Sequence, residues 1–229
     1  MRNHFHAEID YLVDALVGMG EVVADMLARG VRSLVRRDLA LADEVIRADD
    51  DVDARYVEVQ NRIVRTLALQ APVASDLRLL SAMLHVNIHL ERMGDYALNV
   101  ARMAKLSADY SDEPELADQL REMAEIAIRV GQEAVASFAQ RDLDRAQRLP
   151  LLDDSVDQLN IGLFKRLVRL ASNDETYLEW ATHMILVARQ IERWSDHAVD
   201  VGEATIFAVT GEMVELSSNT PTPSGGPAS

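Results

Sequence analysis

Two copies of a short acidic motif are the residues of this chain best suited to chemistry. The segment ERMGDYA at 91–97 recurs as ERWSDHA at 192–198, 101 residues later. Each copy has two acids four residues apart, a spacing that places both carboxylates on one face of a helix. The four acids are Glu91, Asp95, Glu192 and Asp196. Brought together in a folded chain, such pairs would form an anionic site for a divalent or trivalent metal ion.

Two further acid pairs extend this pattern. Asp49 and Asp53 recur as Asp153 and Asp157, 104 residues later. Like charges one helical turn apart repel each other, so each pair destabilises its own helix unless a cation lies between the carboxylates. One such pair is usually a solvated helix face. Four pairs at equivalent places favour metal ligation.

The residues within the motif leave one alternative open. Arg92 and Arg193 follow the glutamates and could pair with the acids as helix-surface salt bridges. Gly94 and Ser195 lie between the two acids of each pair, and residues this small would let a neighbouring helix come close.

The donor atoms narrow the choice of metal. Sites made only of carboxylates suit iron, manganese, magnesium or calcium, with zinc or nickel as further occupants. The Glu-x-x-His pattern of di-iron oxidase bundles is missing, which disfavours redox catalysis. His85 and His89 share a helix face, but their counterparts Leu186 and Gln190 are not metal ligands. The repeat therefore favours a packing or surface role for these histidines.

The amino-acid composition excludes or disfavours several classes of function. The 229 residues are 48% hydrophobic but only 5% aromatic, and there is no cysteine, which excludes disulfides, thiolate-bound zinc and iron–sulfur clusters. A net charge of -15, from 38 acids against 23 bases, disfavours nucleic acid as a partner. We find no signal-peptide pattern and no apolar run of about 20 residues. We expect a cytoplasmic protein that meets membranes only through membrane complexes.

The hydrophobic spacing predicts an all-α fold, because apolar residues recur every three or four positions almost throughout. We expect helices over 5–37, 39–69, 73–108, 113–140, 142–171 and 174–212. Asp38 and Asp142 precede two of them as candidate N-caps. The repeat divides the chain into two tandem three-helix bundles, 1–110 and 111–215. The remaining tail, 216–229, is rich in Ser, Thr, Pro and Gly and is predicted to be disordered.

Two residues break the repeat. Pro150 stands where the first half has Ile46, three residues before Asp153. A proline inside a helix removes a hydrogen bond, so we expect the fifth helix to start late or to bend, displacing its acid pair. Trp194 is bulkier than its counterpart Met93, so the two sites need not be equally occupied.

These motifs resemble the PhoU family. The resemblance rests on the two acidic motifs, on PVASDLR at 72–78 and on IFAVTGE at 206–212, and it spans roughly 3–215. The composition is similar to that of PhoY-type members from actinobacteria. The resemblance implies two similar three-helix bundles that bind multinuclear metal clusters through Glu/Asp-x-x-x-Asp motifs. Its ligands would be Glu91, Asp95, Glu192 and Asp196, joined by Asp49, Asp53, Asp153 and Asp157 on the second helices.

The resemblance also implies a function. It predicts a non-enzymatic negative regulator of the phosphate-starvation response and of phosphate uptake. Such a protein would link the ATPase subunit of the phosphate-specific ABC transporter to the phosphate sensor histidine kinase, and would form a homodimer. Two alternatives rest on the same acids: a carboxylate-bridged metalloenzyme, and a metal-binding storage protein.

Overall fold

The structure is a computed structural model that describes residues 2–110 and 113–217. Within these ranges the chain is helical and contains no strand, so the predicted all-α class is confirmed. The six long helices and one short 3-10 turn are α1 (Arg2–Arg36), α2 (Leu39–Gln70), α3 (Ala74–Leu106), α4 (Pro114–Gln140), α5 (Leu143–Asn173), η1 (Glu175–Tyr177) and α6 (Leu178–Thr210). None of the described helices is both long enough and apolar enough to cross a membrane.

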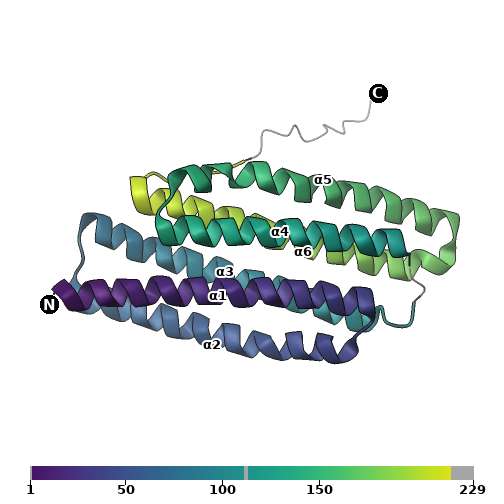
Figure 1. Ribbon diagram of the computed structural model, residues 1–229, viewed down its shortest axis with the longest axis horizontal. Helices are drawn as coiled ribbons and strands as arrows, with labels where there is room; N and C mark the ends of the chain where they lie inside the picture. The colour runs from purple at the N-terminus through teal and green to yellow at the C-terminus, as the bar shows by residue number, and fades with distance from the viewer. Residues whose placement is uncertain (1, 111–112, 218–229) are drawn as a thin grey trace, which may run out of the picture.

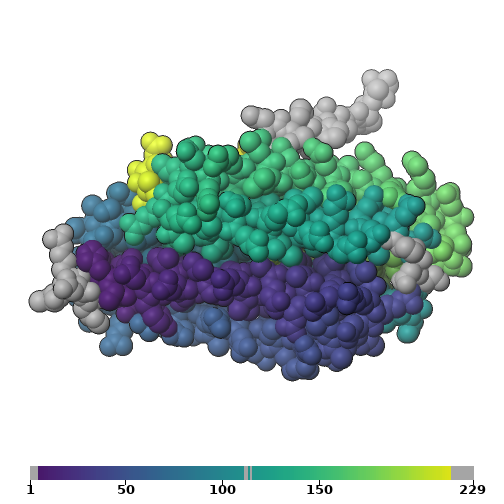
Figure 2. Space-filling model, in the orientation of Figure 1, coloured from purple at the N-terminus to yellow at the C-terminus, as the bar shows by residue number. Residues whose placement is uncertain are grey.

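The helices form two three-helix bundles that lie side by side along their length. Helices α1, α2 and α3 make one bundle, and α4, α5 and α6 make the other (Figure 1). The bundles meet through two pairs, α1 against α4 and α3 against α6. Figure 2 shows α1 and α4 side by side along the length of this side of the molecule. Helices α2 and α5 lie on the outside, and each packs mainly against the other two long helices of its own bundle.

The helix ends follow local chemistry. The carboxylate of Asp38 accepts a hydrogen bond from the backbone N–H of Leu41 (3.0 Å), and Asp142 accepts one from Arg145 in the same way (3.0 Å). Both predicted N-caps are therefore confirmed, and each satisfies a donor that the first helical turn leaves free. Gly211 caps the C-terminus of α6, and its φ of 82° is the left-handed conformation that glycine adopts without strain.

The two bundles repeat each other in their cores. The buried positions of α1 recur in α4 at an offset of 104 residues: Leu12, Leu16, Met19, Val23 and Met26 correspond to Leu116, Leu120, Met123, Ala127 and Val130. The buried hydroxyls of Ser33 and Ser137, also 104 apart, donate to the backbone carbonyls of Gly30 and Ala134 (both 2.7 Å). The apolar spacing that the two halves share in sequence thus corresponds to equivalent buried positions in the structure.

Helix α5 departs from the expectation for Pro150. The helix runs from Leu143 to Asn173 with Pro150 buried inside it, so the predicted late start is wrong. Pro150 is the eighth residue of the helix, where it lacks the N–H that would bond to the carbonyl of Ala146. Asp153, one turn later, stays buried and faces α6.

One compensating exchange of side-chain size distinguishes the cores of the two halves. The side chain of Trp194 is fully buried, and its ring lies over Gly131 of α4. The first-half counterparts of these two residues are Met93 and Leu27, both buried. A large residue opposite a small one therefore replaces two residues of medium size, and this exchange accommodates the tryptophan.

We expect Gly131→Ala to destabilise the protein by about 1–3 kcal/mol, because a Cβ built there would lie 2.4 Å from Cη2 of Trp194. Gly162→Ala is the matched control. Nothing lies within 4 Å of a Cβ at that helical position, so alanine there should stabilise by about 0.5–1 kcal/mol. Urea unfolding of both variants measures the difference. Equal effects of the two substitutions would contradict this account of Trp194 packing.

The described chain extends past α6 into the segment predicted as a tail. Leu216 packs against the core, and its backbone N–H donates to Oε1 of Glu203 (2.7 Å). The rest of that segment, 218–229, lies outside the described residues.

Candidate metal centres

The second-half acids converge between α5 and α6. Asp153 and Asp157 from α5 and Asp196 from α6 each offer a carboxylate oxygen, and these oxygens all lie within 4.8 Å of one another. Glu192 lies one turn before Asp196 on the same helix and is 8% exposed. We call these four residues the α5–α6 acid cluster.

Two neighbours hold the buried carboxylates of this cluster in place. The hydroxyl of Ser195 donates to Oδ1 of Asp153, which is 9% exposed. The guanidinium of Arg189 pairs with Oε1 of Glu192. Arg189 therefore takes the role that sequence analysis gave to Arg193, whose side chain is exposed.

Burial and mutual repulsion make these acids hard to ionise. The pKa of Asp153 is raised to about 7, chiefly by burial; the hydrogen bond from Ser195 opposes this rise, and repulsion from Asp157 adds to it. Burial, followed by repulsion from Asp196, raises the pKa of Glu192 to about 7 against the opposing effect of Arg189. The pKa values of Asp157 and Asp196 are raised as well, again chiefly by burial.

The α5–α6 acid cluster fits a metal ion. Oε2 of Glu192 is buried and has no hydrogen-bond partner in the described structure. The cluster offers only oxygen donors, and it gathers more negative charge than Arg189 alone can balance. A hard cation would satisfy the free oxygen and relieve the repulsion that raises these pKa values.

The first-half acids are more open. Asp49 and Asp53 lie on α2, and Glu91 and Asp95 lie on α3. Burial and repulsion from Asp53 and Asp95 raise the pKa of Asp49 to about 6, and burial and Asp95 raise that of Glu91. No three of these acids bring ligand atoms within 4.8 Å of one another in the part of the chain that the structure describes. We call these four residues the α2–α3 acid group.

The side chain of Arg92 occupies part of the first-half group. It donates to Oδ2 of Asp95 (2.9 Å) and lies 3.5 Å from Oε2 of Glu91. The salt bridge considered in the sequence analysis therefore exists in this half. Gly94 brings α2 close as expected, since a Cβ there would lie 3.1 Å from Cγ1 of Val52. Glycine has no hydroxyl to fix an aspartate, as Ser195 does in the other half.

A third cluster was missed by sequence reasoning. His89 of α3 lies against His197 and Asp200 of α6, half-buried between the two bundles. Burial lowers the pKa of His89 and so favours its neutral form. His85, by contrast, is exposed. The repeat gave no signal for His89, because its three-residue group spans both halves and does not recur within either.

Comparison with known proteins places this architecture in a known group. A family model described as the PhoU domain matches residues 16–104 and 120–205. The phosphate-specific transport system accessory protein PhoU homolog of Aquifex aeolicus is 34% identical, over 91% of this chain and 94% of that protein. The homolog of the same description from Rhizobium meliloti is 31% identical, over 90% and 87%. The crystal structure of PhoU from Pseudomonas aeruginosa superposes with a TM-score of 0.86 at 31% identity, covering 91% of this chain and all of that chain.

Proposed function

This chain belongs to the PhoU family, a family of accessory and regulatory proteins rather than enzymes, and we propose that it is a metal-binding adaptor that restrains the phosphate-starvation response. In this proposal the protein works in the cytoplasm, as a homodimer. It links the ATPase subunit of a phosphate-specific ABC transporter to a phosphate sensor histidine kinase. When phosphate is plentiful, the linked kinase does not activate its response regulator, and uptake is held down.

The observation that carries this proposal is an acid face that recurs between the second and third helices of each bundle. Asp153, Asp157, Glu192 and Asp196 would hold a metal ion or a small cluster of ions between α5 and α6. The bound metal supplies positive charge that neutralises the carboxylates and fixes the two helices relative to each other. The α2–α3 acid group would bind metal more weakly, because Arg92 already compensates part of its charge.

Exposed apolar side chains continue each of these faces. Val57 follows Asp53 by one turn of α2, and Ile161 follows Asp157 by one turn of α5; the two are 53% and 48% exposed. Two helical turns further along, Val64 of α2 and Val168 of α5 are exposed too. Metal-bearing acids followed by an apolar strip suit a surface that docks on another protein. Two such faces, one on each bundle, suit an adaptor with two partners.

An affinity purification from phosphate-replete cells, with mass spectrometry of the co-eluting proteins, tests the proposal. We expect to recover the transporter ATPase and the sensor kinase with the wild-type chain. We expect Val57→Asp combined with Ile161→Asp to lose both, because the charges would be buried at the two docking faces. Gly162→Ala, beside Ile161 but without a new charge, should retain them. Failure of the folded, metal-loaded wild type to recover either partner would refute the adaptor role.

A further inference from the structure

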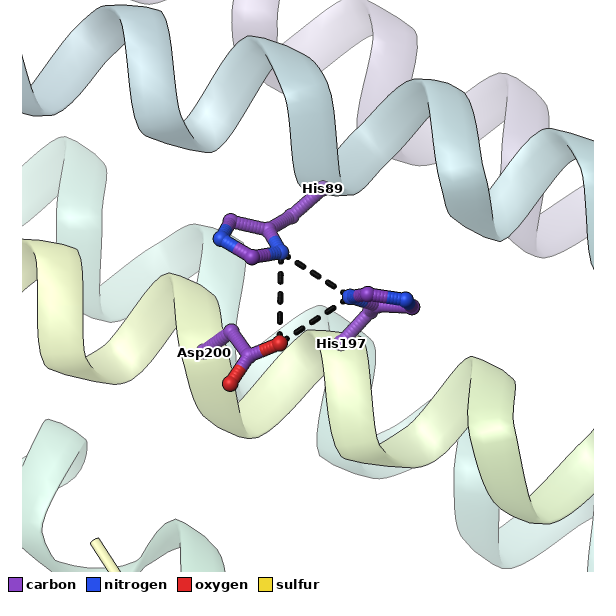
Figure 3. A group of neighbouring side chains, drawn as sticks. All are labelled: His89, His197 and Asp200. Atoms are coloured by element: carbon purple, nitrogen blue, oxygen red, sulfur yellow. Dashed lines mark hydrogen bonds and ion pairs between the residues drawn. The ribbon is translucent and has the colours of Figure 1, made fainter. Parts of the chain in front are cut away.

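Three ligand-type atoms from both bundles meet where α3 crosses α6. Nδ1 of His89 lies 2.9 Å from Nδ1 of His197 and 3.2 Å from Oδ2 of Asp200, and Nδ1 of His197 lies 3.0 Å from the same oxygen (Figure 3). The two rings and the carboxylate thus point toward one shared centre.

With Asp200 ionised, simple hydrogen bonds do not satisfy all three contacts of this triangle. A ring nitrogen that carries a proton has no lone pair in the ring plane, so it can donate or accept but not both. If both nitrogens donate to Asp200, the 2.9 Å contact joins two donors. If one histidine donates to the other, the accepting nitrogen faces the carboxylate oxygen without a proton between them. A cation near the centre would attract all three lone pairs at once.

We propose that His89, His197 and Asp200 form a binding site for a first-row divalent transition-metal ion that joins the two bundles. Two imidazole nitrogens and one carboxylate oxygen are a donor set for such ions, whereas magnesium and calcium prefer oxygen alone. Neighbouring ligands of an octahedral ion at about 2.1 Å are about 3.0 Å apart, close to the triangle observed. The ligand atoms of a tetrahedral zinc ion would lie about 3.4 Å apart, so the three side chains would have to move apart by a few tenths of an ångström.

A second residue orients the ligand histidine. The hydroxyl of Tyr96 lies 3.3 Å from Nε2 of His197, and the two rings stack with centroids 5.4 Å apart. A proton on Nε2 that is donated to Tyr96 leaves Nδ1 of His197 with its lone pair free for metal. Partners of this kind fix the tautomer and the ring direction of metal-bound histidines.

The repeat supplies an internal comparison for this site. Advancing His89 by 101 residues gives Gln190, and moving Asp200 back by 101 gives Asn99. Asn99 and Gln190 also meet across the α3–α6 contact, where Nδ2 of Asn99 donates to Oε1 of Gln190 (3.4 Å). The pair Asn99–Gln190 is thus the pseudo-symmetric equivalent of the pair Asp200–His89. The first pair carries two amides, and the second carries two potential metal ligands.

The site is separate from the α5–α6 acid cluster, although both use α6. Asp196 faces Asp153 and Asp157 of α5, whereas the adjacent His197 faces His89 and Tyr96 of α3. The inference stands on its own geometry and does not require the adaptor function or a metal in the acid cluster.

Zinc binding to the full-length protein tests the proposal. Equilibrium dialysis counts bound Zn²⁺, and X-ray absorption at the zinc edge reports whether imidazole is a ligand. We expect the double variant His89→Gln and Asp200→Asn, which installs the residues of the other half, to bind one Zn²⁺ fewer per chain and to lose the imidazole signal. Tyr96→Phe should weaken this binding by about 10–100-fold.

The double variant Asn99→Ala and Gln190→Ala is the control, because it changes the pseudo-equivalent pair and leaves the ligands intact. It should bind as much Zn²⁺ as the wild type, with the same imidazole signal. Only oxygen ligands around zinc in the wild type would overturn the proposal. An unchanged imidazole signal in the His89→Gln, Asp200→Asn variant would overturn it equally.

Discussion

The metal-free protein should lose about 3 kcal/mol of unfolding free energy as the pH rises from 5 to 8. Asp153 and Glu192 have folded-state pKa values of about 7, whereas unfolded acids titrate near pH 4. Between these values the folded state holds protons that the unfolded state has released, so stability falls as the pH rises. One proton retained over about two pH units corresponds to about 3 kcal/mol. The two shifts share the same repulsion within the cluster, so their contributions are not additive.

Thermal unfolding in the presence of a chelator measures this effect, which corresponds to a fall in Tm of about 6–12 °C for a chain of this size. The double variant Asp153→Asn and Glu192→Gln should show a flatter pH profile, because it carries no titrating group at the two buried places. The variant Asp118→Asn, Glu122→Gln is the control for the general charge repulsion in a chain with net charge -15. Both of these acids are exposed on α4, so this variant should keep the wild-type slope.

Metal should reverse the loss. At pH 8, Mn²⁺ at 100 times its Kd would stabilise the wild type by about 2.7 kcal/mol and leave the Asp153→Asn, Glu192→Gln variant nearly unchanged. A Tm that stays level or rises between pH 5 and pH 8 in the metal-free wild type would show that Asp153 and Glu192 do not retain their protons in the folded state.

Sequence reasoning was most accurate where the cause is local. The caps Asp38 and Asp142, the helical spacing and the approach permitted at Gly94 all depend on a few neighbouring residues, and all are confirmed. Of the two outcomes expected from Pro150, the late helix start is wrong. A proline costs a helix one hydrogen bond, but burial of the surrounding face against α4 and α6 outweighed that cost.

Features that depend on how the two bundles meet could not be predicted from the repeat. Internal symmetry identifies equivalent positions, and it was used to set His89 aside because Gln190 is no ligand. At a contact between the halves, however, His89 needs no equivalent residue, because its partners His197 and Asp200 come from the other half. The inequality of the two acid sites likewise depends on Ser195, whose hydroxyl has no counterpart at Gly94.

Removing the charge of the acid faces should abolish phosphate-dependent repression while leaving the protein folded. The variant replaces Glu91, Asp95, Glu192 and Asp196 with their amides, which keep the shape of each side chain but bind metal poorly. Neutral amides also remove the repulsion between neighbouring buried carboxylates. The variant should therefore be at least as stable as the metal-free wild type at pH 8. In phosphate-replete cells we expect a phosphate-starvation reporter and phosphate uptake to rise to the level of a strain without the protein.

The matched control removes the same charge from places that hold no cluster. Glu21 and Asp25 on α1, with Asp118 and Glu122 on α4, are two exposed pairs four residues apart. Their surface ion pairs, such as Asp25 with Arg29, are worth about 0–1 kcal/mol, so the four amide substitutions should leave both fold and repression intact. If both fourfold variants derepress alike, net charge rather than the acid faces governs the response. If the acid-face variant still represses while folded, those faces are not the working surface.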